Sequence, residues 1–479
     1  MARSVRTNFL YSLLSNISGI LYPLLTFPYA SRILQADGIG QVSFFASIIS
    51  YVGLFSSLGI PIYAIREIAK IRDDKPKRDS TAIEILLLHL ALTLVGYLGV
   101  VAICLFVPQV TGDVPLFLIL SAELFLNAIG AEWFFVGNED FKYITLRGLL
   151  IRCISVVLLY ICVHSKDDIL IYAIVLILGT VGNNVFNFIR LRRLISWSDI
   201  NLKSLCVIRH LYPSLKVFAL YAIISLYVNL NSLLLGFMCS NVAVGYYAGA
   251  TRITQLLLGI VRALQGVLIP RSSYLAKEQT KDAFNLLCQK TVDFVVLLSI
   301  PLSVGTVVMA PAVIRLFCGA SYAPAITTLT IMSPIILLIA LSGIPCFQIL
   351  YPLGHEKEAI WSVATGAVVN LLLCLLLIPV YSYNGAAIAV VACELVVTIT
   401  MFLFGRKYIH VKRWSVHYMN CVLAGIVMLV TIYGVRVLNL SDWLNILVIP
   451  IIGALVYGGI LVIRKDEFVL KEIMCKVKI

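Results

Sequence analysis

Apolar residues follow one another along this chain in blocks of about 20, and short polar stretches separate the blocks. An α-helix of this length crosses the roughly 30 Å of hydrocarbon in a bilayer. The blocks lack the alternation with period two that marks the strands of a membrane barrel. The pattern therefore predicts an all-α membrane protein with about fourteen transmembrane helices, over residues 8–31, 40–61, 81–107, 114–136, 146–164, 168–189, 214–238, 243–269, 290–311, 325–352, 359–379, 385–405, 416–436 and 443–463.

The composition supports a chain that lies almost wholly in the membrane. Hydrophobic residues make up 61% of it, charged residues 13%, and the mean hydropathy is +0.99. Soluble domains carry roughly 25% charged residues. The first apolar block is too long for a signal peptide and is interpreted as an uncleaved span. The twelve cysteines are scattered, without the spacing of a zinc site or a disulfide framework.

The net charge of +13 is explained by topology rather than by binding to nucleic acid. Lysine and arginine concentrate at the N-terminus and in every even-numbered connection between spans, which together hold about 28 of the 37 basic residues. The positive-inside rule then predicts that both termini are cytoplasmic. These loops would also attract anionic lipid headgroups.

Two stretches come into register when the first half of the chain is laid over the second at an offset of about 205 residues. Residues 35–41 fall on residues 240–246, and each stretch is a glycine-containing turn between the first two spans of its half. The offset joins spans of equal orientation, so it predicts a parallel repeat. We expect a six-helix lobe over 1–200, a second over 201–410, and two appended helices with a cytoplasmic tail over 411–479.

The span over 243–269 carries the most informative polar residues. Arg252, Gln255 and Arg262 fall, with neighbouring threonines and a glutamine, within an arc of roughly 160° on a helix. Ionisable groups at membrane depth face a partner or a wet cavity. This side is interpreted as the lining of a cavity that holds water or an anion. A structural ion pair, or side chains that reach a headgroup, would give the same pattern.

Polar and charged residues in other spans extend this prediction. Small polar stripes run along the first, second and seventh spans and include Asn16, Ser47 and Asn229, although such stripes also help helices to pack. Arg152 and Lys216 lie near the cytoplasmic side, as part of a basic entrance or as interface anchors. Asp293 and Glu123 are candidates for ion coupling or for pairing with an arginine.

Motifs for catalysis or for ATP hydrolysis are missing from the sequence. It contains no Gly-Lys dipeptide and hence no Walker P-loop. The run over 355–359 resembles HExxH, but Ala359 replaces the second histidine. No stretch outside the membrane exceeds about 25 residues, so no soluble catalytic domain is expected. The sequence predicts no catalytic residues, no metal site and no cofactor, and we expect that the protein is not an enzyme.

Three segments resemble one known family. The chain reads AEWFFVGNEDFKYITLR over 131–147, GYYAGATRI over 245–253 and NFLYSLLSNISGILYPLLTFPYASRIL over 8–34. With the length and the predicted repeat, these segments look like the polysaccharide-transporter family of O-antigen or capsule repeat-unit flippases. That family belongs to the multidrug/oligosaccharidyl-lipid/polysaccharide exporter superfamily.

The resemblance implies a flippase that works by alternating access. It would move a polyprenyl-pyrophosphate-linked oligosaccharide repeat unit from the cytoplasmic to the outer leaflet of the bacterial plasma (inner) membrane. Expected partners are this lipid, the surrounding membrane lipids, and a downstream polymerase with a chain-length regulator; nucleic acid is not expected. Arg252, Arg262, Lys216 and Arg152 would bind the pyrophosphate. Gln255, Asn16, Asn229 and Ser47 would bind sugar, and coupling to H⁺ or Na⁺ stays open through Asp293 or Glu123.

Other members of the superfamily remain the alternative. Its cation-coupled drug exporters carry carboxylates in the first or seventh span. In this chain the first and seventh spans contain no Asp or Glu. Its peptidoglycan-precursor (lipid II) flippases keep arginines in the first span, where this chain has only Arg32 at the outer end. A membrane enzyme such as a polymerase or ligase would need a long outward-facing loop, and the odd-numbered loops here are short.

Overall fold

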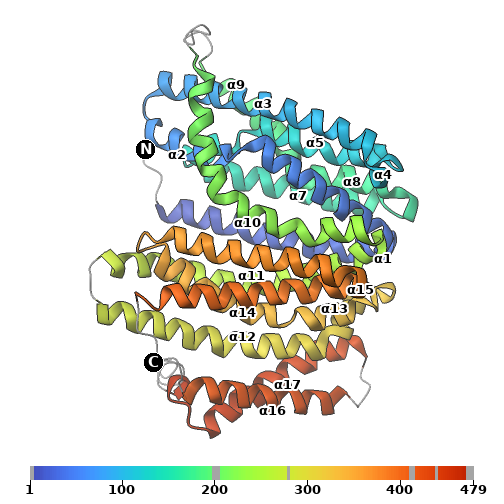
Figure 1. Cartoon of the computed structure of the whole chain (residues 1–479), viewed down its shortest axis with the longest axis vertical. Coiled ribbons are helices and arrows are strands. Elements are labelled where there is room, and N and C mark those ends of the chain that lie inside the picture. The colour runs from blue at the N-terminus through green and yellow to red at the C-terminus, as the bar shows by residue number, and fades with distance from the viewer. Residues whose placement is uncertain (1–4, 197–204, 278–280, 409–415, 437–440, 471–479) are drawn as a thin grey trace. The chain divides into compact units, whose positions relative to one another are not determined.

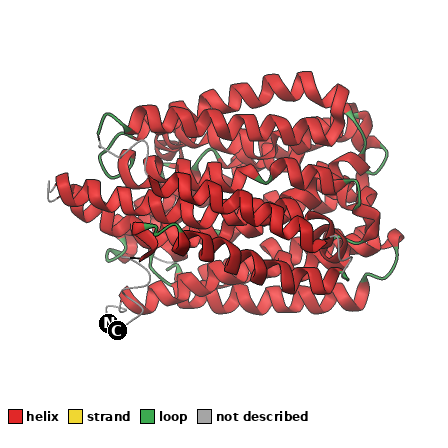
Figure 2. Ribbon diagram, turned by 90° about the horizontal axis from the view of Figure 1, so that it is seen from below, coloured by secondary structure: helices red, strands yellow, loops and turns green. Residues whose placement is uncertain are grey.

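The computed structural model describes residues 5–196, 205–277, 281–408, 416–436 and 441–470. These residues form helices joined by short turns, and no strand occurs among them (Figure 2). The predicted all-α fold is therefore confirmed. Figure 1 shows the helices in chain order by colour, from blue at the N-terminus to red at the C-terminus.

The helices agree with a chain that crosses the membrane about fourteen times. Among the described residues, ten helical segments are long and apolar enough to span a bilayer. Two of them each hold two predicted spans, joined at a single residue with non-helical backbone angles. This residue is Gln35 in the first of these segments and Ser382 in the second. Two further helices coincide with the predicted seventh and eighth spans. These four helices are α1 (Val5–Ser57), α15 (Glu356–Gly405), α10 (Leu211–Met238) and α11 (Asn241–Lys277).

The chain divides into two compact units, and the first runs from Met1 to Gly245. In this unit α1 packs against α3, α5, α7 and α10. Fully buried aromatic rings from α1 and α5 form part of its core, where Phe45 meets Phe117 edge to face. Besides α1 and α10 the unit contains α2 (Ile60–Ile71), α3 (Lys75–Phe106), α4 (Pro108–Thr111), α5 (Val114–Gly130), α6 (Glu132–Gly137), α7 (Phe141–Cys162), α8 (Ile169–Ile177) and α9 (Asn183–Leu194).

The second unit runs from Tyr246 to Ile479 and is built around α12. This helix packs against α13, α14, α16 and α17, so the two appended C-terminal helices are part of the unit's core. The helices of this unit, besides most of α11 and α15, are α12 (Lys281–Phe317), α13 (Ala325–Met332), α14 (Pro334–Ile344), α16 (Val416–Arg436) and α17 (Asp442–Ile463).

The boundary between the compact units differs from the predicted lobe boundary. Helix α10, which we expect to open the second lobe, packs against α1 and α2 and is therefore counted with the first unit. Units defined by contact need not coincide with a repeat defined by topology. The division into six, six and two helices over 1–200, 201–410 and 411–479 stays a prediction.

Gly40 and Gly245, which the repeat offset places in register, mark a close approach of two helices. A Cβ atom on Gly40 would overlap the backbone carbonyl of Asn241, and one on Gly245 would overlap the backbone carbonyl of Ala36. Only glycine allows backbones to approach so closely. The two equivalent turns therefore carry glycine for a packing reason.

Candidate functional site: a polar cavity in the first unit

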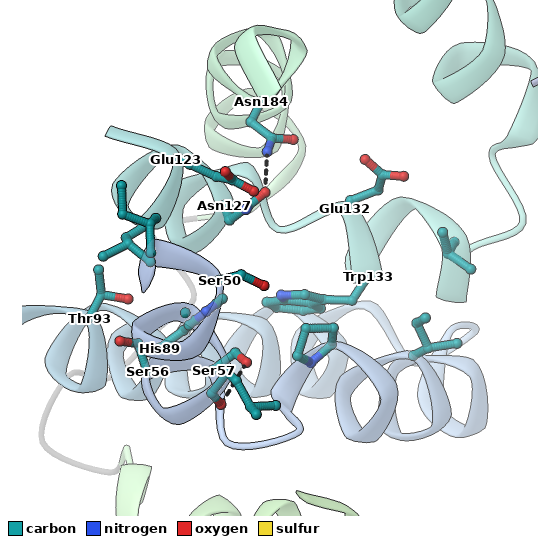
Figure 3. Close-up of a pocket in the computed structure, with 17 residues that line it drawn as sticks. Ser50, Ser56, Ser57, His89, Thr93, Glu123, Asn127, Glu132, Trp133 and Asn184 are labelled. Atoms are coloured by element: carbon teal, nitrogen blue, oxygen red, sulfur yellow. Dashed lines mark hydrogen bonds between the residues drawn. The ribbon is translucent and has the colours of Figure 1, made fainter. Parts of the chain in front are cut away.

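A backbone break between α5 and α6 begins the motif over residues 131–147. Ala131 adopts left-handed angles, φ 41° and ψ 42°, which are uncommon for a residue other than glycine. The chain turns there and continues as the short helix α6. The turn brings Glu132 and Trp133 to the wall of a cavity that α1, α3 and α9 also line (Figure 3).

This cavity has a volume of about 540 Å³, within the range of small-molecule sites, and lies wholly in the first unit. Its walls combine apolar side chains with an unusual number of polar ones for a membrane bundle. Figure 3 shows these polar side chains on the helices that surround the cavity. They are Ser50, Ser56 and Ser57 of α1, His89 and Thr93 of α3, Glu123 and Asn127 of α5, Glu132 and Trp133 of α6, and Asn184 of α9.

A chain of side-chain amides leads to the carboxylate of Glu123. Asn187 donates to the Oδ1 atom of Asn184 over 3.4 Å, and Asn184 donates to the Oδ1 atom of Asn127 over 3.1 Å. Asn127 in turn hydrogen-bonds Glu123. A Cβ atom on Gly130 would overlap the side chain of Asn184, so this glycine allows α9 to approach α5. The chain fixes Glu123 at the cavity wall.

Three side chains that line the cavity have a buried polar atom without a protein partner. They are His89 through Nδ1, Thr93 through Oγ1 and Trp133 through Nε1, and none of these atoms has a hydrogen-bond partner among the described residues. The side chains are only 4%, 3% and 3% exposed. A buried polar group without a partner costs about 1–3 kcal/mol, so a ligand or water that bonded to these atoms would stabilise the structure.

The second half of the motif builds an arginine cluster next to the cavity. Arg190 of α9 pairs with Asp140 over 2.7 Å and lies over the ring of Tyr143, 3.8 Å from its centre. Arg147 is buried and forms a loose ion pair of 3.5 Å with Glu132 at the cavity rim. The motif over 131–147 therefore contributes both a wall of the cavity and the charges beside it.

The structure places the predicted site residues of the first unit in several environments. Arg152 donates to the hydroxyl of Ser18 and to the carbonyl of Ser15 on α1. Lys216 is exposed and lies over the ring of Tyr212, with Nζ 4.5 Å from the ring centre. Asn16 is exposed on α1.

Two further predicted residues differ in whether they reach the cavity. Asn229 of α10 donates to the hydroxyl of Ser50 over 2.8 Å, and Ser50 lines the cavity. Ser47 is buried, and its hydroxyl donates to the carbonyl of Phe44 in its own helix over 2.6 Å. Asn229 therefore reaches the cavity wall, whereas the Ser47 hydroxyl is engaged by its own backbone.

In the second unit, Arg252, Gln255 and Arg262 are all exposed and share one side of α11. Asp293 lies on α12, where Gln289 donates to its carboxylate over 2.8 Å and also to the hydroxyl of Tyr418 over 2.8 Å. Asp293 is therefore part of a polar contact between α12 and α16.

The opposite side of α11 faces an apolar groove of about 630 Å³. Leu257 and Val261 of α11, Leu298 of α12 and Gly458 of α17 are among the residues that line it. All lining residues belong to the second unit, and almost all are hydrophobic.

The sequence indicated Glu123, as a candidate for ion coupling or for pairing with an arginine, and the polar stripe that includes Ser50, but it gave no role to most of the other polar side chains of the cavity. His89, Thr93 and Asn127 are isolated polar residues in apolar blocks, and Asn184 directly follows Asn183. His89 offered the clearest signal, because it is a titratable group in the middle of a predicted span. Trp133 lay within the quoted motif and received no role.

Two families match this chain over more than half its length. The family described as "Polysaccharide biosynthesis protein" matches residues 5–276, and the family described as "Lipid II flippase MurJ" matches residues 149–453. A protein of Escherichia coli (strain K12) named "Putative O-antigen transporter" is 28% identical over 408 residues, which cover 84% of this chain and 97% of that protein. A protein of the same name from Shigella dysenteriae is 23% identical over 401 residues, covering 83% and 99%.

Solved structures of related transporters share the fold. A lipid II flippase MurJ in an inward closed conformation matches with a TM-score of 0.72 and 16% identity, over 96% of this chain and 99% of that one. A multidrug resistance MATE family transporter of the MOP superfamily, in an inward-facing conformation, matches with a TM-score of 0.67 and 14% identity, over 81% and 94%. At these identities the likeness concerns the fold alone.

Proposed function

The chain belongs to the polysaccharide biosynthesis protein family, within the multidrug/oligosaccharidyl-lipid/polysaccharide exporter superfamily, and on that premise we propose that it flips polyprenyl-pyrophosphate-linked oligosaccharide repeat units. It is a multi-pass membrane protein whose named relatives are transporters and flippases. In the proposed reaction the repeat unit moves from the cytoplasmic to the outer leaflet of the bacterial plasma membrane, for O-antigen, capsule or exopolysaccharide synthesis.

The observation that carries this proposal is the two-sided character of α11. At 100° per residue, Arg252, Gln255 and Arg262 fall within roughly 80° of arc. Leu257 and Val261, which line the apolar groove, lie on the opposite side. One helix thus offers guanidinium groups on one side and a hydrocarbon surface on the other. A cargo that joins a pyrophosphate to a prenyl chain has the matching chemistry.

Arginine suits the charged part of such a cargo. Its planar guanidinium donates two parallel hydrogen bonds to a phosphate and stays charged at any physiological pH. We propose that Arg252 and Arg262 bind the pyrophosphate and that Arg152 and Lys216 attract it on entry. The sugars would meet amide and hydroxyl groups, among them Gln255, Asn16 and Asn229.

The apolar groove supports a place for part of the prenyl chain. Its lining offers the chain an environment similar to lipid, so the chain can enter or leave it at little cost in free energy. The groove would therefore guide the cargo without retaining it.

The membrane potential can supply driving force for this transport. With the cytoplasm negative, outward movement of one negative charge is favourable by about 2.3 kcal/mol per 100 mV. A pyrophosphate diester with about two charges would gain roughly twice that. Asp293 and Glu123 stay candidates for coupling to H⁺ or Na⁺, and removal of the product by a downstream polymerase would add to the driving force.

Mass spectrometry of polyprenyl-linked saccharides in a strain that lacks this gene tests the proposal. We expect one complete repeat unit to accumulate, inaccessible to a glycosidase that does not cross the membrane, while surface glycan is lost. Normal surface glycan without accumulation, in a strain with no second flippase gene, would refute it. Accumulation of the peptidoglycan precursor lipid instead would assign the alternative cargo, which shares the pyrophosphate and prenyl chemistry and which the match to MurJ favours.

A further inference from the structure

We propose that the polar cavity of the first unit is a binding site for one sugar residue of the cargo, an inference that rests on the flippase function proposed above. The cavity lies between α1, α2, α3, α5, α6 and α9, and its lining includes Trp133, Thr93, His89 and Glu123 (Figure 3). Its free polar atoms and its volume of about 540 Å³ determine what it can hold.

The free polar atoms argue against a bare cation as the ligand. The indole N–H of Trp133 only donates hydrogen bonds, and a cation needs atoms that donate electron pairs. The described residues contain no group of three His, Cys, Asp or Glu side chains arranged to hold a metal ion. A volume of about 540 Å³ also exceeds what a single ion fills.

Hydroxyl groups match the free atoms of this cavity. Trp133 supplies a donor, the Glu123 carboxylate is an acceptor, and the Thr93 hydroxyl can act as either. A hydroxyl both donates and accepts, so a molecule with several hydroxyls can satisfy all three at once. The amide chain from Asn187 to Glu123 holds the carboxylate in place for this purpose. A sugar ring has hydroxyls on successive carbons and therefore fits.

The remaining lining suits the carbon skeleton of a sugar. Apolar side chains such as Leu54 and Leu124 form the rest of the wall, and Trp133 adds the flat face of an indole. The C–H groups of a pyranose pack against such surfaces while its hydroxyls bond at the edge. Water alone would satisfy the polar atoms but would leave this apolar surface wet.

The rim of the cavity lies on the side where the cargo is assembled. Glu132 at the rim is 49% exposed at its side chain and lies in the last turn of the predicted fourth span, 114–136. The positive-inside rule places that end at the cytoplasmic face. A repeat unit is completed at the cytoplasmic face before it is transported. The cavity would therefore bind one of its sugars when the cargo is loaded.

Saturation-transfer NMR with the purified full-length protein in nanodiscs tests binding directly. The probes are methyl glycosides of hexoses and of N-acetylhexosamines. We expect at least one to bind with a millimolar Kd, and expect Thr93→Val and Glu123→Gln each to weaken it about tenfold or more. Trp361→Phe is the control, because Trp361 is exposed on α15 and does not line the cavity. Binding that is absent, or unchanged in both cavity variants, overturns the proposal.

A second measurement distinguishes sugar recognition from ion coupling. Cells that lack the gene receive either the natural protein or Thr93→Val, and make either complete repeat units or units truncated by loss of the last glycosyltransferase. We expect the natural protein to favour complete units and the variant to lose that preference at normal abundance. An equal loss for both cargoes, with altered sensitivity to a proton ionophore, would assign the cavity to ion coupling and overturn sugar binding. If the protein binds glycosides but loss of the gene leaves the lipid-linked sugars unchanged, the flippase function is refuted and sugar binding is not.

Discussion

The turn that precedes α10 is anchored to α3 by the buried carboxylate of Glu84. This side chain is 3% exposed. It accepts hydrogen bonds from the backbone N–H of Cys206 over 2.7 Å, from Nε2 of His210 over 2.8 Å and from the guanidinium of Arg209. The hydroxyl of Tyr63 on α2 extends the network to Nδ1 of His210, over 2.7 Å. The network therefore fixes where α10 begins.

We expect Glu84→Gln to loosen this turn while the fold persists. A hydrogen bond to a charged group contributes about 1.5–3 kcal/mol, and the amide keeps one acceptor atom but removes the charge. Because about 1.4 kcal/mol corresponds to a factor of ten, local opening should become roughly 10- to 100-fold more frequent. Hydrogen exchange with mass spectrometry, read in peptides that cover 205–211, measures this directly.

Glu139→Gln is the matched control for this experiment. Glu139 pairs with Arg72 over 2.6 Å, but its side chain is 51% exposed, and exposed pairs contribute about 0–1 kcal/mol. We expect exchange at 205–211 to stay unchanged in the control. Unchanged exchange in Glu84→Gln would refute the anchor at Glu84. An equal increase in exchange across α5 to α9 would also refute it, because the whole unit would then be unfolding.

The same turn should respond to pH through His210, which lies outside the membrane-spanning segments. Burial lowers the pKa of His210 below its ordinary value, although Glu84 acts in the opposite direction. The folded turn therefore holds a neutral imidazole that donates from Nε2 to Glu84 and accepts from Tyr63. The unfolded turn takes up a proton first as pH falls through about 6.5, so acid weakens the folded turn. Exchange at 205–211, corrected for its intrinsic rate, should rise on acidification; a fall would indicate a charged imidazole.

Three further variants and one control test the second unit by complementation of a deletion strain, with surface glycan and membrane abundance measured together. Arg252→Ala should reduce transport at least about tenfold at normal abundance, since it removes a charge-assisted contact to phosphate; full activity would exclude Arg252 from the site. Arg262→Lys should keep part of the activity if charge alone matters, and complete loss would indicate a bidentate contact. Gly458→Phe should lower transport by filling the apolar groove, whereas Gly459→Phe, which points to an exposed position without close neighbours, should not; equal effects would refute a role for the groove.

The sequence predicted the helices well because each apolar block must satisfy its backbone within the membrane. The predicted span over 81–107 ends one residue beyond the end of α3 at Phe106. The sequence predicted a turn over 35–41, where Gln35 interrupts the helix, but it did not predict the break at Ala131, a residue other than glycine in a left-handed backbone conformation. Such conformations depend on neighbours that are distant in sequence.

The candidate site was predicted only in part, and Ser47 illustrates why. Ser47 and Ser50 lie three residues apart on the same polar stripe, about 60° apart around the helix. Ser50 reaches the cavity, while Ser47 is buried and bonds its own backbone. The polar stripe in the sequence does not distinguish Ser47 from Ser50. The neighbouring helices determine which edge of the stripe faces the cavity. Asn184 joins Ser50 at the cavity from a point 134 residues further along the chain.

A flippase must recognise its cargo and then release it, and the polar cavity suits both requirements. Water can satisfy the free atoms of His89, Thr93 and Trp133 when the cavity is empty, and sugar hydroxyls can replace that water. The exchange of one hydrogen bond for another changes the free energy little. A cargo without the matching hydroxyl would displace water and leave a buried group without a partner, at about 1–3 kcal/mol. Selectivity between cargoes can therefore be large although the affinity for any one of them stays low enough for release.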